Sequence, residues 1–496
     1  MTLTLGIDIG TYESKGVLVE ADGTVVAQAA RPHRMHVPRP GWAEHRPEAE
    51  WWGDTCALCR ELLVTSGRPS TDIAAVALSA IGPCLLPVDA EGAPLRDGIL
   101  YGVDTRAAAE IAEMTEQIGA ETILERCGNA LTSQSVGPKI LWLKRHEPEV
   151  YAAAATFHTS TSFVVHRLTG ERVIDHYTAA NFSPLYDAGA QDWTDDLAPG
   201  LVRPDQLPRL MWSNEIAGTV TARAAEATGL APGTPVTVGT IDAGAEALSV
   251  GVRQTGDMML MYGSTIFIIL LTEARVRDGR LWTAPWLFPG RHAAMAGLAT
   301  SGTLTHWFRD QLARELPREA AFATLAAEAA EVPPGAEGLL CLPYFSGERT
   351  PIHDPHASGT FFGLTLTHTR AHLYRALIEG IAHGTAHVTD TFAEAGAAPA
   401  RVLAVGGGTK NALWLQATSD LTGLPQVVPR TTLGASYGNA FLARLALGEV
   451  AAEDIARWNP PEREATPERH AAYDRARPLW RRLYAQTKDI MHDLSG

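Results

Sequence analysis

The sequence predicts an α/β fold in two domains, and three observations carry this prediction. The chain has 496 residues, more than one hydrophobic core usually covers, so we expect two domains of about 250 residues each. We place them at 1–248 and 249–496. Short apolar runs of strand character alternate with helical segments. A strand, a turn of glycine and hydroxyl residues and a second strand also occur near the start of each half.

In the first half, strands and helices follow one another with a turn signal at most junctions. Asp22-Gly23 separates two strands, Pro47 suits the start of a helix, and Gly170 suits the end of one. The expected strands are 4–9, 16–20, 25–30, 73–79, 84–88, 99–101 and 235–238, and the expected helices are 48–64, 138–145, 161–168 and 245–250. Loops rich in Asp, Trp and Pro at 181–211 are expected to shape one rim of a cleft.

The hairpin at residues 3–19 carries chemistry at its tip. Gly10 allows the backbone to approach an anion closely, Thr11 adds a hydroxyl donor, and Lys15 can neutralise a phosphate. Asp8 can hold a hydrated Mg²⁺ beside them. The pattern suits the phosphate tail of a nucleoside triphosphate, and an ordinary hairpin with a polar turn is the alternative.

Composition excludes several classes of function. The formal net charge is −15, and no run of Lys or Arg offers a basic patch, so we expect no nucleic-acid partner. No apolar stretch reaches membrane-spanning length and no signal peptide opens the chain, which predicts a cytoplasmic protein without membrane contact. The five cysteines are scattered and odd in number, so no disulfide framework is expected. Cys56 and Cys59 are interpreted as structural thiols.

Asp242 lies in a tight turn where the apolar strand at 235–238 gives way to small residues. Its carboxylate would stand at the mouth of a sheet, where it can act as a general base. An aspartate before a helix is also a common N-cap. The hairpin that follows, at 256–271, repeats the plan of the first one with Gly263 and Ser264 in its turn, which suggests a duplicated phosphate clamp.

The second half contains a glycine-rich turn between a strand at 402–405 and a helix at 412–421. Gly407, Gly408 and Asn411 lie in this turn, which lacks both the Rossmann spacing and the Walker lysine and hydroxyl. Further helices are expected at 303–312, after Gly302, and at 369–394. The last 50 residues are expected to form an outer, helical packing layer.

Three segments lie close together in the second half: Leu-Pro-Tyr-Phe-Ser-Gly-Glu-Arg-Thr-Pro at 342–351, Gly-Thr-Phe-Phe-Gly-Leu at 359–364, and residues 372–379. Together they resemble the signature region of the FGGY family of carbohydrate kinases, and most of all its xylulokinase members. Further matches follow the family order along nearly the whole chain. They are residues 8–11, Trp51-Trp52, Asp104 with Arg106, residues 138–142, Asp242, Gly263-Ser264 and 406–408.

This resemblance implies two actin-like, ribonuclease-H-like domains with a central cleft, with ATP against the C-terminal domain and a sugar against the N-terminal one. It implies that Asp242 is the catalytic base and that Asp8 lies near Mg²⁺. The implied ATP contacts are Gly10, Thr11, Lys15, Gly263, Ser264, Gly302, Gly407, Gly408 and Asn411. Phosphoryl transfer needs this set of parts: a base, a metal and donors around the phosphates.

One departure from the family pattern falls on the sugar side. Xylulokinases carry Met-His-Gly where this chain has Ile81-Gly82-Pro83, and Trp-Asn-Asp where it has Gly102-Val103-Asp104. Ile81, Gly82 and Asp104 are the expected sugar contacts beside Asp242. A wall without the imidazole is more apolar, which predicts broader or shifted selectivity.

The expected function is an ATP- and Mg²⁺-dependent kinase of a small sugar, with D-xylulose or a related ketopentose as the leading acceptor. Another small polyol or a deoxy sugar is the alternative, and a homodimer is a compatible assembly. An actin-like or Hsp70-like nucleotide switch would share the fold, but it gives no reason for Asp242 or for the segment at 346–351. A dinucleotide dehydrogenase fails on glycine spacing.

Overall fold

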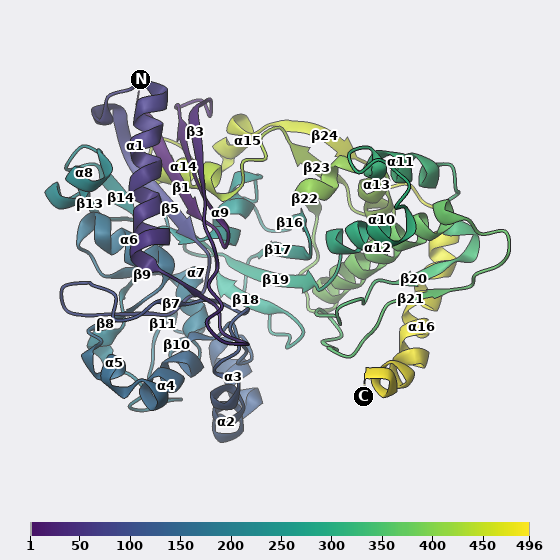
Figure 1. Ribbon diagram of the computed structural model, residues 1–496, viewed down its shortest axis with the longest axis horizontal. Helices are drawn as coiled ribbons and strands as arrows, with labels where there is room; N and C mark the ends of the chain where they lie inside the picture. Colours follow the sequence, from purple (N-terminus) through teal and green to yellow (C-terminus); the bar gives the residue numbers. More distant parts are fainter. Residues whose placement is uncertain (1, 496) are drawn as a thin grey trace.

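The computed structural model describes residues 2–495, and these form two lobes, each built on a seven-stranded mixed sheet (Figure 1). The first sheet has the order β13-β14-β5-β1-β2-β3, with β15 also pairing with β5. Its strands are β1 (Leu3–Ile9), β2 (Glu13–Val19), β3 (Val25–Pro32), β5 (Ile73–Ala80), β13 (Ile216–Thr219), β14 (Pro235–Thr237) and β15 (Thr240–Ile241).

The second sheet repeats the central motif of the first. Its order is β18-β19-β17-β16-β22-β23-β24, and its β16–β17 hairpin lies beside a parallel strand, β22, as the β1–β2 hairpin lies beside β5. The repeat read from the sequence is therefore a repeat in the structure. The strands are β16 (Asp257–Tyr262), β17 (Ile266–Thr272), β18 (Trp282–Pro285), β19 (His292–Leu298), β22 (Arg401–Val405), β23 (Gln426–Pro429) and β24 (Pro461–Ala465).

Shorter strands connect the loops around the first sheet and extend the second lobe. They are β4 (Glu44–His45), β6 (Leu86–Val88), β7 (Gly98–Ile99), β8 (Thr156–His158), β9 (Val173–Asp175), β10 (Tyr186–Asp187), β11 (Asp192–Trp193), β12 (Arg209–Met211), β20 (Leu340–Leu342) and β21 (Thr360–Phe362). The region at 181–211 thus contains short strands rather than loops alone. The strand expected at 99–101 is shorter, because the chain turns at 101–104.

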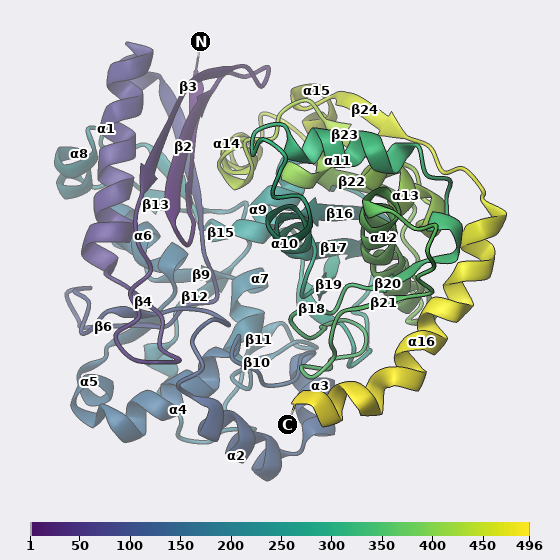
Figure 2. The ribbon, with the colours of Figure 1, turned by 45° about the vertical axis from the view of Figure 1, so that its right-hand side comes forward.

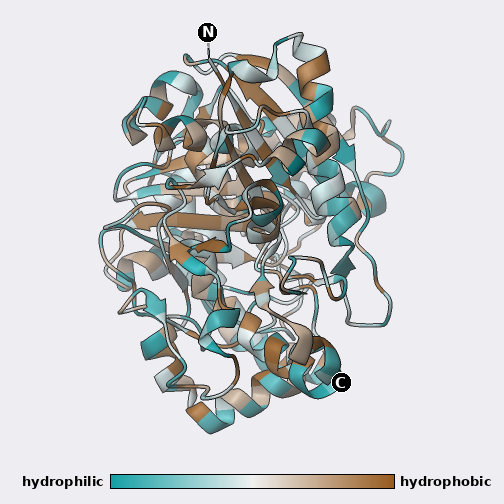
Figure 3. Ribbon diagram, turned by 90° about the vertical axis from the view of Figure 1, so that its left-hand side faces the viewer, coloured by the Kyte–Doolittle hydropathy of each residue, from teal (hydrophilic) through white to brown (hydrophobic). Residues whose placement is uncertain are grey.

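Helices cover the sheets, whose central strands are hydrophobic (Figure 3). The helix expected at 48–64 is a π-helical turn, Pro47–Gly53, that continues into α1. The α-helices are α1 (Asp54–Ser66), α2 (Ala108–Ile118), α3 (Ala120–Cys127), α4 (Val136–His146), α5 (Pro148–Ala153), α6 (Ser160–Thr169), α7 (His176–Ala179), α8 (Ala222–Thr228), α9 (Asp242–Ser249), α10 (Gly302–Leu312), α11 (Ala321–Ala330), α12 (Arg370–Glu394), α13 (Ala412–Thr422), α14 (Ala435–Ala446), α15 (Ile455–Trp458) and α16 (Ala471–Ser495).

The C-terminal segment is an outer layer, as the sequence predicts, with one addition. Helix α16 runs along the outside of the second lobe (Figure 2), where the indole N–H of Trp480 donates to the Cys341 carbonyl at 2.7 Å. The addition is β24, which pairs with β23 at the edge of the second sheet. The five cysteines are free thiols.

Helix α14 comes from the second half of the chain but packs on the first sheet, against β1 and α9 (Figure 1). Glycines allow this close approach. A Cβ on Gly6 of β1 would lie 1.9 Å from the Ser436 carbonyl oxygen, and a Cβ on Gly438 would lie 1.9 Å from the Ala245 carbonyl oxygen. The division at residues 248 and 249 stays a prediction, with α14 bridging the two parts.

We predict that Gly438→Ala destabilises the protein. The added methyl group meets rigid backbone, and overpacking of this kind typically costs about 1–3 kcal/mol, against a helix-propensity gain of about 1 kcal/mol. Gly384→Ala in α12 is the control, since its Cβ would meet only the end of the Leu298 side chain, at 3.1 Å. Chemical denaturation should show a lower free energy of unfolding for Gly438→Ala alone. Equal stability of both variants would contradict the tight packing of α14.

Candidate active site

A cavity of about 320 Å³ lies where the carboxyl ends of parallel strands β1, β5 and β15 meet, and both halves of the chain line it. The first half contributes Gly82, Pro83, Tyr101, Asp242 and Glu246. The second half contributes Met261, Thr265, Phe267, Trp282, Met295 and Arg349. Polar groups at the carboxyl ends of strands are typical of ligand sites in α/β folds.

Asp242 is the first residue of α9 and lines this cavity. The N-cap position belongs to Ile241, and the Asp242 carboxylate accepts only from the neighbouring Ala243 N–H, at 2.8 Å. Burial and the nearby negative charge of Asp8 raise the pKa of Asp242 well above its usual value. The alternative role as an N-cap is therefore not what the geometry shows, and a half-buried carboxylate that faces a cavity is suited to proton transfer.

Asp8 lies near the end of β1 and is fixed by a chain of hydrogen bonds. The Ser79 hydroxyl donates to Asp8 Oδ1 at 2.8 Å, and Asn439 Nδ2 on α14 donates to Ser79 Oγ at 2.7 Å. Burial raises the pKa of Asp8 to about 6, against the lowering effects of Ser79 and Lys15. A half-buried carboxylate with one side-chain donor is suited to binding a cation.

Glu246 is a site residue that sequence reasoning missed. It lies one helical turn after Asp242, lines the same cavity, and burial together with the charge of Asp8 raises its pKa to about 7. Its spacing from Asp242 was the available signal, because residues four apart share one face of a helix.

The tip of the β1–β2 hairpin is held from below by two histidines that the sequence did not single out. His33 donates from Nε2 to the Gly10 carbonyl at 2.9 Å and from Nδ1 to Asp54 at 2.8 Å. Burial lowers the pKa of His33, but the bonds to Asp54 and to the Gly10 carbonyl outweigh burial and raise the pKa above its usual value. His45 donates to the Thr11 carbonyl at 3.1 Å.

His45 differs from His33 in the direction of its pKa shift. Its Nδ1 accepts from the Trp51 indole at 3.1 Å, and burial lowers its pKa to about 4, so His45 is neutral.

Thr11 Oγ1 lies 3.1 Å from the hydroxyl of Tyr101, which also lines the cavity. Lys15 is opposite Asp8 in the hairpin, with its ammonium 3.2 Å from Glu13. The hairpin and the cavity wall are therefore in direct contact.

A second cavity, of about 570 Å³, lies in the second lobe between the β16–β17 turn, α10 and the start of α13. Gly263, Ser264, Gly302, Gly407, Gly408 and Asn411 all line it, so the structure brings together these six predicted ATP contacts. Gly10, Thr11 and Lys15 are not among its lining residues and belong to the first hairpin. Lining residues that the sequence did not indicate include Phe322, Tyr374, Lys410 and Trp414.

The glycines of the second cavity have distinct physical reasons. A Cβ on Gly302 would lie 2.4 Å from the Gly263 carbonyl oxygen, so Gly302 lets α10 begin against the β16–β17 turn. A Cβ on Gly407 would meet no atom within 4 Å, so the backbone there is open to the cavity. Asn411 caps α13 by accepting from the Trp414 N–H at 3.3 Å. The cavity thus offers backbone donors and aromatic surface together.

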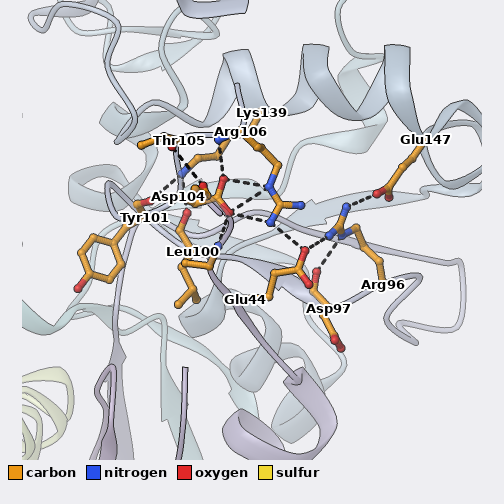
Figure 4. Close-up of polar contacts among 12 residues, drawn as sticks. Glu44, Arg96, Asp97, Leu100, Tyr101, Asp104, Thr105, Arg106, Lys139 and Glu147 are labelled. Atoms are coloured by element: carbon orange, nitrogen blue, oxygen red, sulfur yellow. Dashed lines mark hydrogen bonds and ion pairs between the residues drawn. The ribbon is translucent and has the colours of Figure 1, made fainter. Parts of the chain in front are cut away.

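The structure does not bring Asp104 to the sugar-side cavity, where the sequence interpretation put it. Figure 4 shows its carboxylate turned into a buried cluster, where Arg106 donates from Nε and Nη2 at 2.7–3.0 Å and the Ala43 N–H donates at 2.6 Å. Arg106 also pairs with Glu44 at 2.8 Å and covers the Trp42 ring. Both oxygens of Asp104 already have protein partners, so it supports the loop that carries Tyr101.

Ile81 and Gly82 are the remaining expected sugar contacts, and one of the two lines the cavity. Gly82 and Pro83 line the cavity, whereas Ile81 is buried, with only 2% of its surface exposed, and is not a lining residue. A Cβ on Gly82 would lie 3.0 Å from the Ile241 side chain. The wall that replaces the family's imidazole is therefore apolar.

We predict that Asp104→Ala lowers the free energy of unfolding by about 3–5 kcal/mol, because removing one partner of a buried ion pair leaves the other charge under-compensated. The control is Asp205→Ala, which removes an exposed pair with Arg203 and should cost under about 1 kcal/mol. Both are measured by chemical denaturation. A stable Asp104→Ala variant with weakened sugar binding would restore Asp104 as a sugar ligand.

The part of the chain that the structure describes, residues 2–495, contains no cluster of three or more His, Cys, Asp or Glu side chains that could hold a metal ion by themselves. None of its helices is long and apolar enough to span a membrane.

Comparison with known proteins identifies the family. The FGGY family of carbohydrate kinases matches with its N-terminal domain over residues 3–249 and with its C-terminal domain over 258–447. The xylulose kinase of Escherichia coli (strain K12) is 30% identical over 98% of this chain and 99% of its own. The glycerol kinase of Bordetella parapertussis is 31% identical over 90% of this chain and 88% of its own.

Among solved structures, the xylulose kinase from Rhodospirillum rubrum superposes with a TM-score of 0.92 at 36% identity, over 99% of this chain and 100% of that one. This similarity confirms the expected pair of actin-like, ribonuclease-H-like domains. The chain belongs to the FGGY family of carbohydrate kinases, and it is a sugar kinase that uses ATP and acts on a small sugar.

Proposed function

We propose that this kinase transfers the γ-phosphoryl group of ATP to a hydroxyl of D-xylulose or a related ketopentose, with Asp242 as the base. The observation that carries this proposal is the half-buried Asp242 carboxylate, with its raised pKa, in a cavity lined by both halves of the chain. The similarity to two xylulose kinases over almost the whole chain supports the acceptor.

The nucleotide is assigned to the second cavity. Gly407 gives the base and ribose an open backbone surface, and Gly408 lies beside it against Trp414. Ser264 lies in the turn between this cavity and Thr265, which lines the first cavity, assigned to the sugar. Gly10, Thr11 and Lys15 approach the transferring phosphate from the opposite hairpin. Donors fixed before the reaction stabilise the charge that develops on the transferring group.

Asp8 is the proposed Mg²⁺ ligand. Mg²⁺ sites in kinases use one or two carboxylates together with substrate phosphates, which agrees with the absence of a larger ligand cluster in residues 2–495. When bound, the ion neutralises charge on the phosphates. Asp8 is half-buried, and the hydrogen bond from Ser79 fixes the orientation of its carboxylate before an ion binds.

The apolar wall at Gly82 and Pro83 supports an acceptor range wider than one sugar. A small polyol or a deoxy sugar is the second candidate, since a glycerol kinase is 31% identical over 90% of this chain, beside 30% over 98% for a xylulose kinase. A nucleotide switch without a sugar substrate would leave the cavity around Asp242 without a role. A cytoplasmic location belongs to the proposal, because ATP is supplied there, and the homodimer stays a prediction.

The base assignment predicts that Asp242→Asn lowers kcat by at least about 10²-fold, the usual scale for a general base. Sugar-stimulated ADP release measures this effect, and the KM for ATP should change little because the nucleotide cavity is separate. Asp22→Asn, on an exposed turn, is the control and should keep full activity. If Asp242→Asn turns over like the unchanged protein, the assignment is wrong.

Acceptor selectivity tests the substrate. A panel of ketoses, aldoses, deoxy sugars and small polyols, compared as kcat/KM, should show several acceptors within about 10- to 200-fold of one another, the range that an apolar wall allows per small group. D-Xylulose should be among them. A preference for D-xylulose above about 10³-fold would mean that other residues replace the missing imidazole.

A further inference from the structure

The segment at 346–351 stands out in the sequence, and the proposed chemistry gives it no role. The structure shows that it delivers one side chain, Arg349, to the sugar cavity from the second half of the chain. Asp242 and Glu246 line the same cavity from the first half. Among its lining residues Arg349 is the only arginine or lysine.

The backbone on both sides of Arg349 is firmly anchored. The Thr350 N–H donates to the Gly297 carbonyl of β19 at 3.1 Å, and Glu348 and Asp354 exchange two backbone hydrogen bonds at 2.8 and 2.9 Å. The Glu348 carboxylate accepts from the backbone N–H groups of Arg349 and Ala299, both at 2.7 Å. Arg349 therefore starts from a fixed point on the wall of the cavity.

The Arg349 side chain, in contrast, is exposed, and its guanidinium group has no hydrogen-bond or ion-pair partner among residues 2–495. It lies over Gly297, since a Cβ there would be 3.9 Å from Arg349 Nη1. Other arginines nearby are paired, as Arg280 is with Asp278 at 2.8 Å. An unpaired guanidinium that faces a cavity from a fixed backbone indicates a ligand-binding group. A ligand that covers its N–H donors must accept hydrogen bonds from them, because donors left buried without an acceptor cost free energy.

Two other polar side chains of the lining already have protein partners. Asn129 is used in both directions by the Thr283 backbone, at 2.8 Å each, and the Tyr177 hydroxyl donates to the Met295 sulfur at 3.1 Å. A planar guanidinium presents two parallel N–H groups, which match two neighbouring oxygens. Vicinal hydroxyls of a sugar provide this pair of acceptors.

We propose that Arg349 is a substrate-binding residue that donates to two vicinal hydroxyl oxygens of the sugar, while Asp242 accepts from the hydroxyl that is phosphorylated. The sugar then bridges the two halves of the chain, so Arg349 sets a requirement for an intact diol that the apolar wall at Gly82 and Pro83 cannot impose. This inference rests on the proposed sugar-kinase reaction but not on D-xylulose as the acceptor.

The test uses Arg349→Met, which keeps apolar bulk, and Arg349→Lys, which keeps the charge without the fork. Arg291→Met is the control, because Arg291 is an exposed arginine whose guanidinium contacts only the Gly290 carbonyl. The sugar is the best acceptor of the unchanged protein, and its Kd is followed by tryptophan fluorescence, since Trp282 lines the cavity. Kinetic constants are measured for the same acceptor and for its deoxy analogues.

Arg349→Met should raise the Kd and KM for the sugar by about 10- to 100-fold, the scale of hydrogen bonds to a charged group, with the KM for ATP changed less than about twofold. The Kd and KM of Arg349→Lys for the sugar should lie between those of the unchanged protein and those of Arg349→Met. The unchanged protein should reject one or two deoxy analogues that Arg349→Met accepts as well as the parent sugar.

Three results would overturn the inference. Arg349→Met could bind the sugar as tightly as the unchanged protein does, or its KM for ATP could rise as much as its KM for the sugar. The variant could also lose affinity for the sugar phosphate product alone, which would make Arg349 a phosphate ligand. If the unchanged protein phosphorylates no sugar in the panel, the proposed function fails instead, so the two failures are distinguishable.

Discussion

The position of Asp8 depends on a helix from the other end of the chain. Asn439 on α14 donates from Nδ2 to the Ile7 carbonyl and to Ser79 Oγ, both at 2.7 Å, and Ser79 donates to Asp8. Gly6 and Gly438 bring α14 close enough for these bonds. The carboxylate proposed to hold Mg²⁺ is thus oriented by the contact between the first sheet and the C-terminal part of the chain, and loosening that contact would disturb the site.

In the proposed reaction, the first cavity, lined by Asp242 and Arg349, binds the sugar, and the second, lined by Gly407 and Asn411, binds the nucleotide. The sugar cavity receives its carboxylates from the first half and its cation, Arg349, from the second. The nucleotide cavity lies within the second lobe, and its Gly263-Ser264 turn leads directly to Thr265 in the sugar cavity. Burying the carboxylates of Asp8, Asp242 and Glu246 together raises their pKa values. Binding of a cation is favourable at such a site, because the positive charge stabilises the ionised carboxylates.

Local patterns in the sequence predict a large part of this arrangement. The two hairpins, the turn at Asp242 and the glycines of the nucleotide cavity could be found because strand, turn and helix signals are local. Glu246, His33 and Asn439 could not, because their roles come from tertiary contacts. Asp104 was misplaced since a motif does not show where a carboxylate points, and Arg106 turns it away from the cavity.

In the proposed reaction, the γ-phosphoryl group of ATP in the nucleotide cavity is transferred directly to a sugar hydroxyl beside Asp242. ³¹P NMR of the protein with ATP, Mg²⁺ and its best acceptor tests this directly, because sugar phosphate, ADP and inorganic phosphate give separate signals. We expect one sugar phosphate for each ADP, and we expect ATP to stay intact when the sugar is omitted. ADP accompanied by inorganic phosphate, with no sugar phosphate, would contradict it and would identify a nucleotide hydrolase on the same fold.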